Sequence, residues 1–219
     1  LTMATSVDIC NLALSILGDD GTVVSIIPPD GSDQAGHCAR WYPVALRRIL
    51  ESNPWSFATK RSPLTKLNNV DAAIYGYKGA YALPSQFMRA LKIESAEYLS
   101  EGIDSDLYPE LGHFELGLVE NNTQRVLFCN VTDPVLTYVS YVDNADLFPG
   151  YFIDALMLLL ASYLYGPVKR ADTTSQTAVG IMKQYEAALT KAKTEDAQTS
   201  MRRQETPYIA SQLRARGVW

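Results

Sequence analysis

The spacing of apolar residues changes character twice along this chain of 219 residues. Towards both ends it repeats every three to four residues, which predicts helices. In the middle third short apolar runs alternate with turn residues, which predicts strands. The expected helices cover residues 6–17, 32–53, 149–165 and 173–195. The predicted order is therefore two helices, a β-rich insertion, two further helices and a final segment.

The first two predicted helices have recognisable ends. Ser6 is expected to cap the first helix, because its hydroxyl can accept a hydrogen bond from the first turn, and Gly18 ends that helix. Pro43 lies inside the second helix and cannot donate to the carbonyl of Ala39, so we expect a kink or two abutting helices there. Pro54 ends it. The expected core positions are Val7, Cys10, Leu14, Leu17, Cys38, Tyr42, Ala45, Leu46 and Ile49.

The middle third contains five short runs rich in Val, Leu, Tyr and Phe, which are separated by Gly, Pro, Asn and Asp as in antiparallel strands. These runs are KGAYALP, RALKIES, FELGLVE, QRVLFCN and PVLTYVSYV. The sequence GLVENNTQRVLF predicts a hairpin, because Asn121 and Asn122 tolerate the positive φ of a tight turn. Residues 19–33, in contrast, indicate a turn-rich connection with one short β-prone run.

The third predicted helix contains the apolar run FIDALMLLLASYLYG, residues 152–166. This run is shorter than the roughly 20 residues that span a bilayer, and Asp154 interrupts it, so we expect a buried helix and no membrane contact. Gly166 and Pro167 are expected to end it. The last predicted helix has its expected core positions at Ala178, Met182, Tyr185, Leu189 and Ala192.

Neither pair of helices can bury its apolar surface alone, so the two pairs are expected to complete one bundle. The predicted fold class is α+β: an antiparallel bundle of about four helices, an inserted antiparallel β lobe and an extended C-terminal tail. The bundle is discontinuous and comprises residues 6–54 and 149–195. The β-rich lobe covers residues 55–148, and the tail covers residues 196–219.

Composition narrows the range of functions. A net charge of −5 and a pI near 5.1 give no overall basic footprint for binding nucleic acid. Cys10, Cys38 and Cys129 are far apart in sequence and form no Cys/His cluster, so we expect buried thiols and neither a disulfide framework nor a zinc site. His37 and His113 belong to no catalytic or phosphate-binding motif. We therefore predict no catalytic residue, no cofactor, no metal site and no enzymatic activity.

An acidic stretch in the middle of the chain is the basis for an alternative prediction, an enzyme that uses carboxylates. From residue 93 to residue 124 there are eight carboxylates and no lysine or arginine. Asp104 and Asp106 have the oxygen ligands that a hard cation prefers, but residues 107–109 break the calcium-loop pattern, which favours a solvated loop that repels polyanions. A carboxylate-dependent hydrolase stays open, because the separation of paired carboxylates is a spatial fact. A third interpretation, a small-ligand-binding module, requires a deep apolar pocket between the lobes.

The last residues have the opposite charge. From residue 202 onward there are four arginines and one glutamate, with aromatic and aliphatic residues among them. Arg, Tyr and Trp are enriched where one protein anchors on another, and a segment without a core gains order by docking. The expected docking residues are Arg202, Arg203, Tyr208, Ile209, Leu213, Arg214, Arg216 and Trp219.

The stretch SNPWSFATKRSPL, residues 52–64, predicts a corner at which a helical layer passes into a β layer. The helical pattern runs into Asn-Pro, and a Trp and a Phe follow at once. We expect these aromatic rings to fill the junction and to fix the relative orientation of the two lobes. The structural residues of this corner are Pro54, Trp55, Phe57 and Arg61.

The corner is followed by YKGAYALPSQFMRALKI and then by VLTYVSYVDNADLFPGYFIDALMLLLASYLYGPV. This succession resembles the head-to-tail adaptor proteins of short-tailed phages, often called tail tubular protein A. In that family a helix ends in a Pro-Trp-x-Phe-Ala corner, and a Tyr-Ala-Leu-Pro strand with a downstream Arg comes next. The matching positions are Pro54, Trp55, Phe57, Ala58, Arg61, residues 81–84 and Arg89. The likeness covers most of residues 6–195 and does not include the tail.

The resemblance implies a structural protein that forms a ring, typically of twelve copies, between the portal protein and a tail nozzle of the tail tubular protein B type. Packaged DNA would pass through the lumen without specific binding. The protein would be part of the virion, at the neck of the tail, and would be assembled in the host cytoplasm. Heterologous contacts between copies close such a ring when the rotation per subunit divides the circle.

Overall fold

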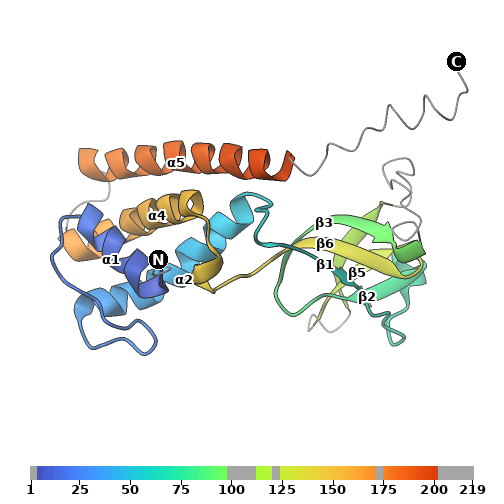
Figure 1. Ribbon diagram of the computed structural model, residues 1–219. Helices are drawn as coiled ribbons and strands as arrows, with labels where there is room; N and C mark the ends of the chain where they lie inside the picture. Colours follow the sequence, from blue (N-terminus) through green and yellow to red (C-terminus); the bar gives the residue numbers. More distant parts are fainter. Residues whose placement is uncertain (1–3, 98–111, 120–123, 171–174, 202–219) are drawn as a thin grey trace, which may run out of the picture. The chain divides into compact units, whose positions relative to one another are not determined.

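The computed structural model describes residues 4–97, 112–119, 124–170 and 175–201 (Figure 1). By the packing of its residues the chain forms two units, Leu1–Leu46 with Asn144–Trp219, and Arg47–Asp143. Most of the described helical residues belong to the first unit, and all described strands belong to the second. The divisions fall after residues 46 and 143, whereas the sequence suggested divisions after residues 54 and 148.

Helix α1, Ser6–Ile16, begins with a capping box, but its cap is Thr5 and not the predicted Ser6. The Thr5 hydroxyl accepts a hydrogen bond from the Asp8 N–H at 3.1 Å, and the Asp8 carboxylate accepts one from the Thr5 N–H at 2.8 Å. Two otherwise unpaired N–H groups are thereby satisfied. At the other end Gly18 follows the helix with a φ of +64°, which confirms the predicted stop.

Helix α2, Asp33–Ser52, is continuous through Pro43, so the alternative of two abutting helices is wrong. Pro43 lies on the exposed side of the helix. The carbonyl that lacks its donor is therefore on a side that water can reach, and the helix tolerates the loss of one hydrogen bond. The predicted stripe of this helix is confirmed, because Cys38, Tyr42, Ala45, Leu46 and Ile49 are all buried.

Helix α4, Gly150–Lys169, is longer than predicted. It runs through Gly166 and Pro167, because a proline in the last turns removes one hydrogen bond without stopping the helix. The helix ends at Lys169, and the following Arg170 has a φ of +49°. At 20 residues this helix is by length and composition apolar enough to cross a membrane, so the predicted length argument fails. Eight of its residues are buried within the protein, as in a core helix: Phe152, Ala155, Leu156, Leu159, Leu160, Ala161, Leu164 and Tyr165.

Helix α5, Gln176–Met201, includes residues 196–201, which the sequence assigned to the tail. It packs antiparallel to α4. The Ser175 hydroxyl donates to the Tyr165 hydroxyl at 2.9 Å near one end, and the Tyr151 hydroxyl donates to Asp196 at 2.9 Å near the other. The predicted core position Met182 is wrong, because this residue is 37% exposed and the preceding Ile181 is buried instead.

The described residues of the second unit form two antiparallel sheets of three strands each, ordered β1-β6-β3 and β2-β5-β4. The strands are β1 Thr59–Pro63, β2 Gly79–Ala82, β3 Phe87–Ser95, β4 Phe114–Leu118, β5 Arg125–Cys129 and β6 Pro134–Ser140. Five of them were predicted, and the β4–β5 pairing confirms the hairpin, whose turn at residues 120–123 lies outside the described residues. Strand β1 was missed because it is a polar edge strand with Lys60 and Arg61 exposed.

The core of the second unit is built around β5, whose residues are buried on both faces. On one face Leu127 and Cys129 pack with Leu136 and Tyr138 of the other sheet. On the opposite face lies a smaller cluster of Ala72, Ala80, Val126 and Phe128, to which the short helix η1, Ala72–Tyr75, contributes. The fold class is thus α+β, with helices and antiparallel sheets in separate parts of the chain.

Candidate functional site

The predicted corner at the end of α2 is a helix cap. Trp55 is fully buried, and its indole N–H donates to the carbonyl of Ile49 at 2.8 Å. This carbonyl is one of the last four of α2, which have no partner within the helix. The Ser52 hydroxyl donates to the same oxygen at 2.7 Å, and Arg89 of β3 reaches the carbonyl of Glu51 at 3.4 Å. Trp55 and Arg89 therefore both donate hydrogen bonds to carbonyl groups at the end of α2.

The same corner leads directly into the first sheet. The Trp55 carbonyl accepts hydrogen bonds from the Ala58 N–H at 3.1 Å and from the Thr59 hydroxyl at 2.8 Å, which turns the chain. The Ala58 carbonyl then accepts from the Ser140 N–H at 2.9 Å, which extends the β1–β6 pairing. Within the second unit, the corner fixes where β1 starts.

The other corner residues have smaller roles. The Phe57 ring lies 6.5 Å from the Trp55 ring and is half-buried, whereas Pro54 is exposed. Arg61 lies 4.0 Å from the carboxylate of Glu94, which also contacts the Lys92 ammonium at 3.4 Å. Glu94 is 7% exposed, so this member of the predicted acidic stretch is a buried carboxylate with cationic neighbours on its own sheet.

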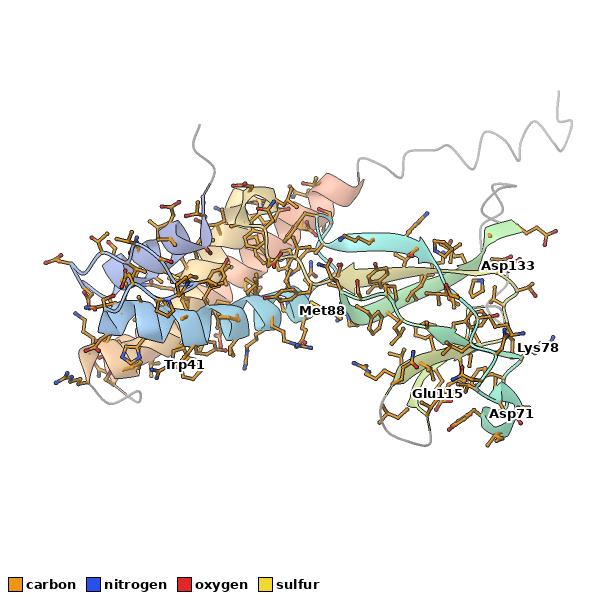
Figure 2. All side chains as sticks on the ribbon, turned by 90° about the horizontal axis from the view of Figure 1, so that it is seen from below. Trp41, Asp71, Lys78, Met88, Glu115 and Asp133 are labelled. Atoms are coloured by element: carbon orange, nitrogen blue, oxygen red, sulfur yellow. The ribbon has the colours of Figure 1, made fainter. Side chains whose placement is uncertain are left out.

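Besides Glu94, the structure describes only Glu97 and Glu115 of the eight carboxylates in the acidic stretch. Asp104 and Asp106 lie outside the described residues, and Glu115 is exposed on β4 (Figure 2). Among the described residues no group of three or more His, Cys, Asp or Glu side chains could hold a metal ion. The hydrolase alternative therefore gains no support from the part of the chain that the structure describes.

His37 lines a small polar pocket of about 210 Å³ in the first unit, and His113 is exposed. The pocket is formed by Asp19, Asp33, Gln34, His37, Pro167, Val168 and Arg170. A larger hollow of about 540 Å³ in the second unit is lined by residues 66–68, 70–73 and 77–80. The small pocket is lined mostly by polar and charged side chains, and the larger hollow by polar and apolar side chains in about equal measure, whereas a small-ligand site is predominantly apolar.

All three cysteines are buried and free, as predicted. Cys10 of α1 and Cys38 of α2, which are distant in sequence, form a hydrogen-bonded pair of side chains. The hydrogen bond to Cys38 and burial raise the pKa of the Cys10 thiol, and burial raises that of Cys129. A thiol must ionise and be accessible to react, so burial and a raised pKa both protect Cys10 and Cys129. The hydrogen bond with Cys10 lowers the pKa of the Cys38 thiol, which burial alone protects.

We therefore predict that the folded protein reacts with a disulfide reagent such as DTNB at least about 100-fold more slowly than the unfolded chain. Absorbance after mixing measures the rate, and the endpoint in guanidinium should be three thiols per chain. A fast phase in native buffer that accounts for one full thiol would contradict the burial of that cysteine.

A feature that the sequence did not reveal is an apolar surface on the segment between α1 and α2. Ile27 is 87% exposed and Val24 is 77% exposed, and the neighbouring Pro28 and Pro29 are exposed as well. We call these four residues the apolar tip. Patterns of apolar residues in sequence usually indicate burial, so only the structure could show that these side chains face solvent.

Trp41 on α2 is an exposed aromatic residue outside the apolar tip (Figure 2). It is 37% exposed, and its ring lies 5.4 Å from that of Tyr163 on α4, so part of its surface stabilises the contact between these helices. The eight docking residues predicted in the tail lie outside the described residues.

No protein-family model matches this chain, and a search of curated proteins gave no match either.

Proposed function

We propose that this protein is a structural head-to-tail connector of a short-tailed phage. In this proposal the helices form one scaffold from which the β unit projects, and the extended C-terminal tail captures a partner. Copies associate into a ring, typically of twelve, between the portal protein and the tail nozzle, and DNA passes through the lumen. The role is mechanical, so no catalytic step, cofactor or membrane contact belongs to it, and the site of action is the neck of the virion.

One observation carries the proposal. The motifs that resemble the adaptor family occur in the family's order, and their most distinctive residues have a common task in this chain. Trp55 and Arg89 both donate to carbonyls at the end of α2, and Ala58 continues the chain into the β1–β6 pairing. A helix end that is capped from the following β unit gives a physical reason for this succession of residue types.

Charge is in keeping with a DNA channel. The chain has 24 acidic and 19 basic residues, which gives a formal charge of −5. A protein that grips DNA neutralises phosphates with clustered lysines and arginines. A wall with a net negative charge lets a polyanion pass without holding it, which suits a conduit.

The test is capture by a portal ring. Purified full-length protein mixed with the portal protein of the same phage should co-sediment as one larger particle, and electron micrographs should show an added ring. Removal of residues 202–219 should weaken this capture at least about tenfold, because anchor-rich segments carry much of a docking energy. A full-length variant with the order of residues 202–219 scrambled is the control for composition.

The connector proposal fails if the full-length protein neither joins the portal nor closes into a ring at any concentration. Capture that is unchanged without residues 202–219 refutes only the role of the tail.

A further inference from the structure

The apolar tip is exposed although the segment that carries it is well ordered by internal hydrogen bonds. The Asp30 carboxylate accepts bonds from the Val24 N–H at 2.8 Å and from the N–H and hydroxyl of Ser32 at 2.9 and 2.6 Å. The Ser25 hydroxyl donates to the Pro28 carbonyl at 2.7 Å. Large apolar side chains on a pre-organised loop favour association, because little conformational entropy remains to be lost on binding.

The base of this loop is fixed to α1. The Asn11 side chain donates to the Val23 carbonyl and accepts from the Val23 N–H, both at 2.9 Å. Val23 and Ile26 are buried beneath the tip, at 1% and 4% exposure. Val24 and Ile27, which directly follow these two buried residues in the chain, are 77% and 87% exposed.

The charge around the tip is one-sided. The first 39 residues of the sequence contain five aspartates and no lysine or arginine. Asp20 and Asp30 are exposed, and hydrogen bonds from the Ser32 hydroxyl and the backbone lower the pKa of Asp30 to about 2. Two cations of α4 lie at the base of the segment, where Lys169 donates to the Gly18 carbonyl at 3.0 Å and Arg170 lines the small polar pocket.

The segment after Met201 has the complementary composition. Its 18 residues include four arginines and one glutamate, and its apolar and aromatic residues match an apolar surface. These are Tyr208, Ile209, Leu213, Val218 and Trp219. An apolar patch with an acidic border and a basic segment with apolar anchors have the complementarity that steers two protein surfaces together.

The two partners belong to opposite ends of the helical unit. The segment between α1 and α2 begins at the end of the helices where α4 is followed by α5. There the Lys169 ammonium donates a hydrogen bond to the Gly18 carbonyl, and the Ser175 hydroxyl donates one to the Tyr165 hydroxyl. Residue 202 follows α5 at the other end, beyond the Tyr151–Asp196 contact, and Figure 1 shows these two ends of the helices. A 26-residue helix is about 39 Å long.

We infer that residues 202–219 of one copy dock on the apolar tip of a second copy. To reach the apolar tip of its own chain, the segment 202–219 would first have to run back along the length of α5, which takes about 12 fully extended residues. Most of the anchors would then be out of reach, whereas a neighbouring copy can receive the whole segment. Two different surfaces at opposite ends of one subunit make a heterologous contact, which is the kind that closes a ring. The inference deepens the proposed function and rests on it for the ring.

The test is direct binding of a fluorescein-labelled peptide of residues 202–219. The receptor is a full-length chain whose own segment is disabled by Arg202→Glu, Arg203→Glu, Arg214→Glu, Arg216→Glu and Trp219→Ala. Fluorescence anisotropy should show saturable binding with a Kd of the order of 10 µM. Adding Ile27→Asp or Val24→Ser to the receptor should weaken binding at least about tenfold. Raising the salt concentration from about 0.05 to 0.5 M should weaken it several-fold.

Ile74→Asp is the matched control, because Ile74 is 73% exposed but belongs to the other unit, and it should change the Kd less than about twofold. The inference is wrong if the peptide does not bind, if a scrambled peptide binds equally well, or if neither tip substitution weakens binding. The readout needs no ring and no portal. Failure of peptide binding with intact portal capture would therefore refute this inference alone. Peptide binding by a protein that neither joins the portal nor closes into a ring would refute the connector proposal alone.

Discussion

Replacing Trp55 with alanine is expected to lower the free energy of unfolding by about 3–5 kcal/mol, the largest effect of any single substitution proposed for this protein. The side chain is fully buried, so its removal leaves a cavity, and the surrounding apolar side chains lose their contacts with the ring. Its hydrogen bond to the Ile49 carbonyl is lost as well. Urea denaturation followed by circular dichroism measures the change.

Two variants separate the contributions. Trp55→Phe keeps most of the packing and should lose about 1 kcal/mol from the hydrogen bond, because the Ser52 hydroxyl still donates to the Ile49 carbonyl. Trp41→Ala, on α2 itself, is the matched control, because the Trp41 ring is already 37% exposed and the expected loss is less than half that of Trp55→Ala. Equal losses at positions 41 and 55 would contradict the corner as described.

Replacing Asn11 with alanine is expected to lower the free energy of unfolding by about 2–4 kcal/mol. The amide of Asn11 pairs with both backbone polar groups of Val23, and Val23 is only 1% exposed. Without Asn11 the N–H and the carbonyl of Val23 lie buried with no side-chain partner. A buried polar group that lacks a hydrogen bond costs more free energy than an average hydrogen bond contributes to stability. Thermal or chemical unfolding of the variant measures the loss.

The same substitution tests the ordering of the apolar tip. Hydrogen exchange of the Val23 and Val24 amides should become at least about tenfold faster in Asn11→Ala, because the anchor of the loop to α1 is removed. Leu12→Ala is the control, since Leu12 is adjacent on α1 and 45% exposed, and it should change the stability by less than about 1 kcal/mol. Unchanged exchange at both amides would show that the loop is ordered without Asn11.

Several elements follow from local sequence. The predicted stripe of α2 and five of the six strands that the structure describes are confirmed, because apolar periodicity indicates which face of an element is buried. The cap at Thr5 could also have been predicted from the sequence, since Thr5 and Asp8 have the spacing of a capping box. Strand β1 carried no such signal, because an edge strand that exposes Lys60 and Arg61 has no apolar alternation.

The candidate sites depended more on tertiary structure. The docking residues of the tail remain a prediction from composition, and Asp104 and Asp106 remain untested. The exposure of Ile27 was not predictable, because an isoleucine in a short β-prone run is usually buried. The sequence also left open whether Ile181 or Met182 of α5 faces the protein core, since steps of three and four residues fit a stripe that contains either residue. The packing of α5 against α4 decides for Ile181.

From the sequence alone, the approximate positions of the helices and of every described strand except β1 could be predicted, as could the need of their apolar faces for partners, because both follow from interactions between residues close together in the chain. The tertiary structure alone decided which distant groups meet: Cys10 with Cys38, Arg89 with the end of α2, and Asn11 with Val23. It also decided which apolar side chains remain uncovered. The physical reason is that burial is a property of the packed assembly of elements, and no local pattern states which surface a neighbouring element will cover.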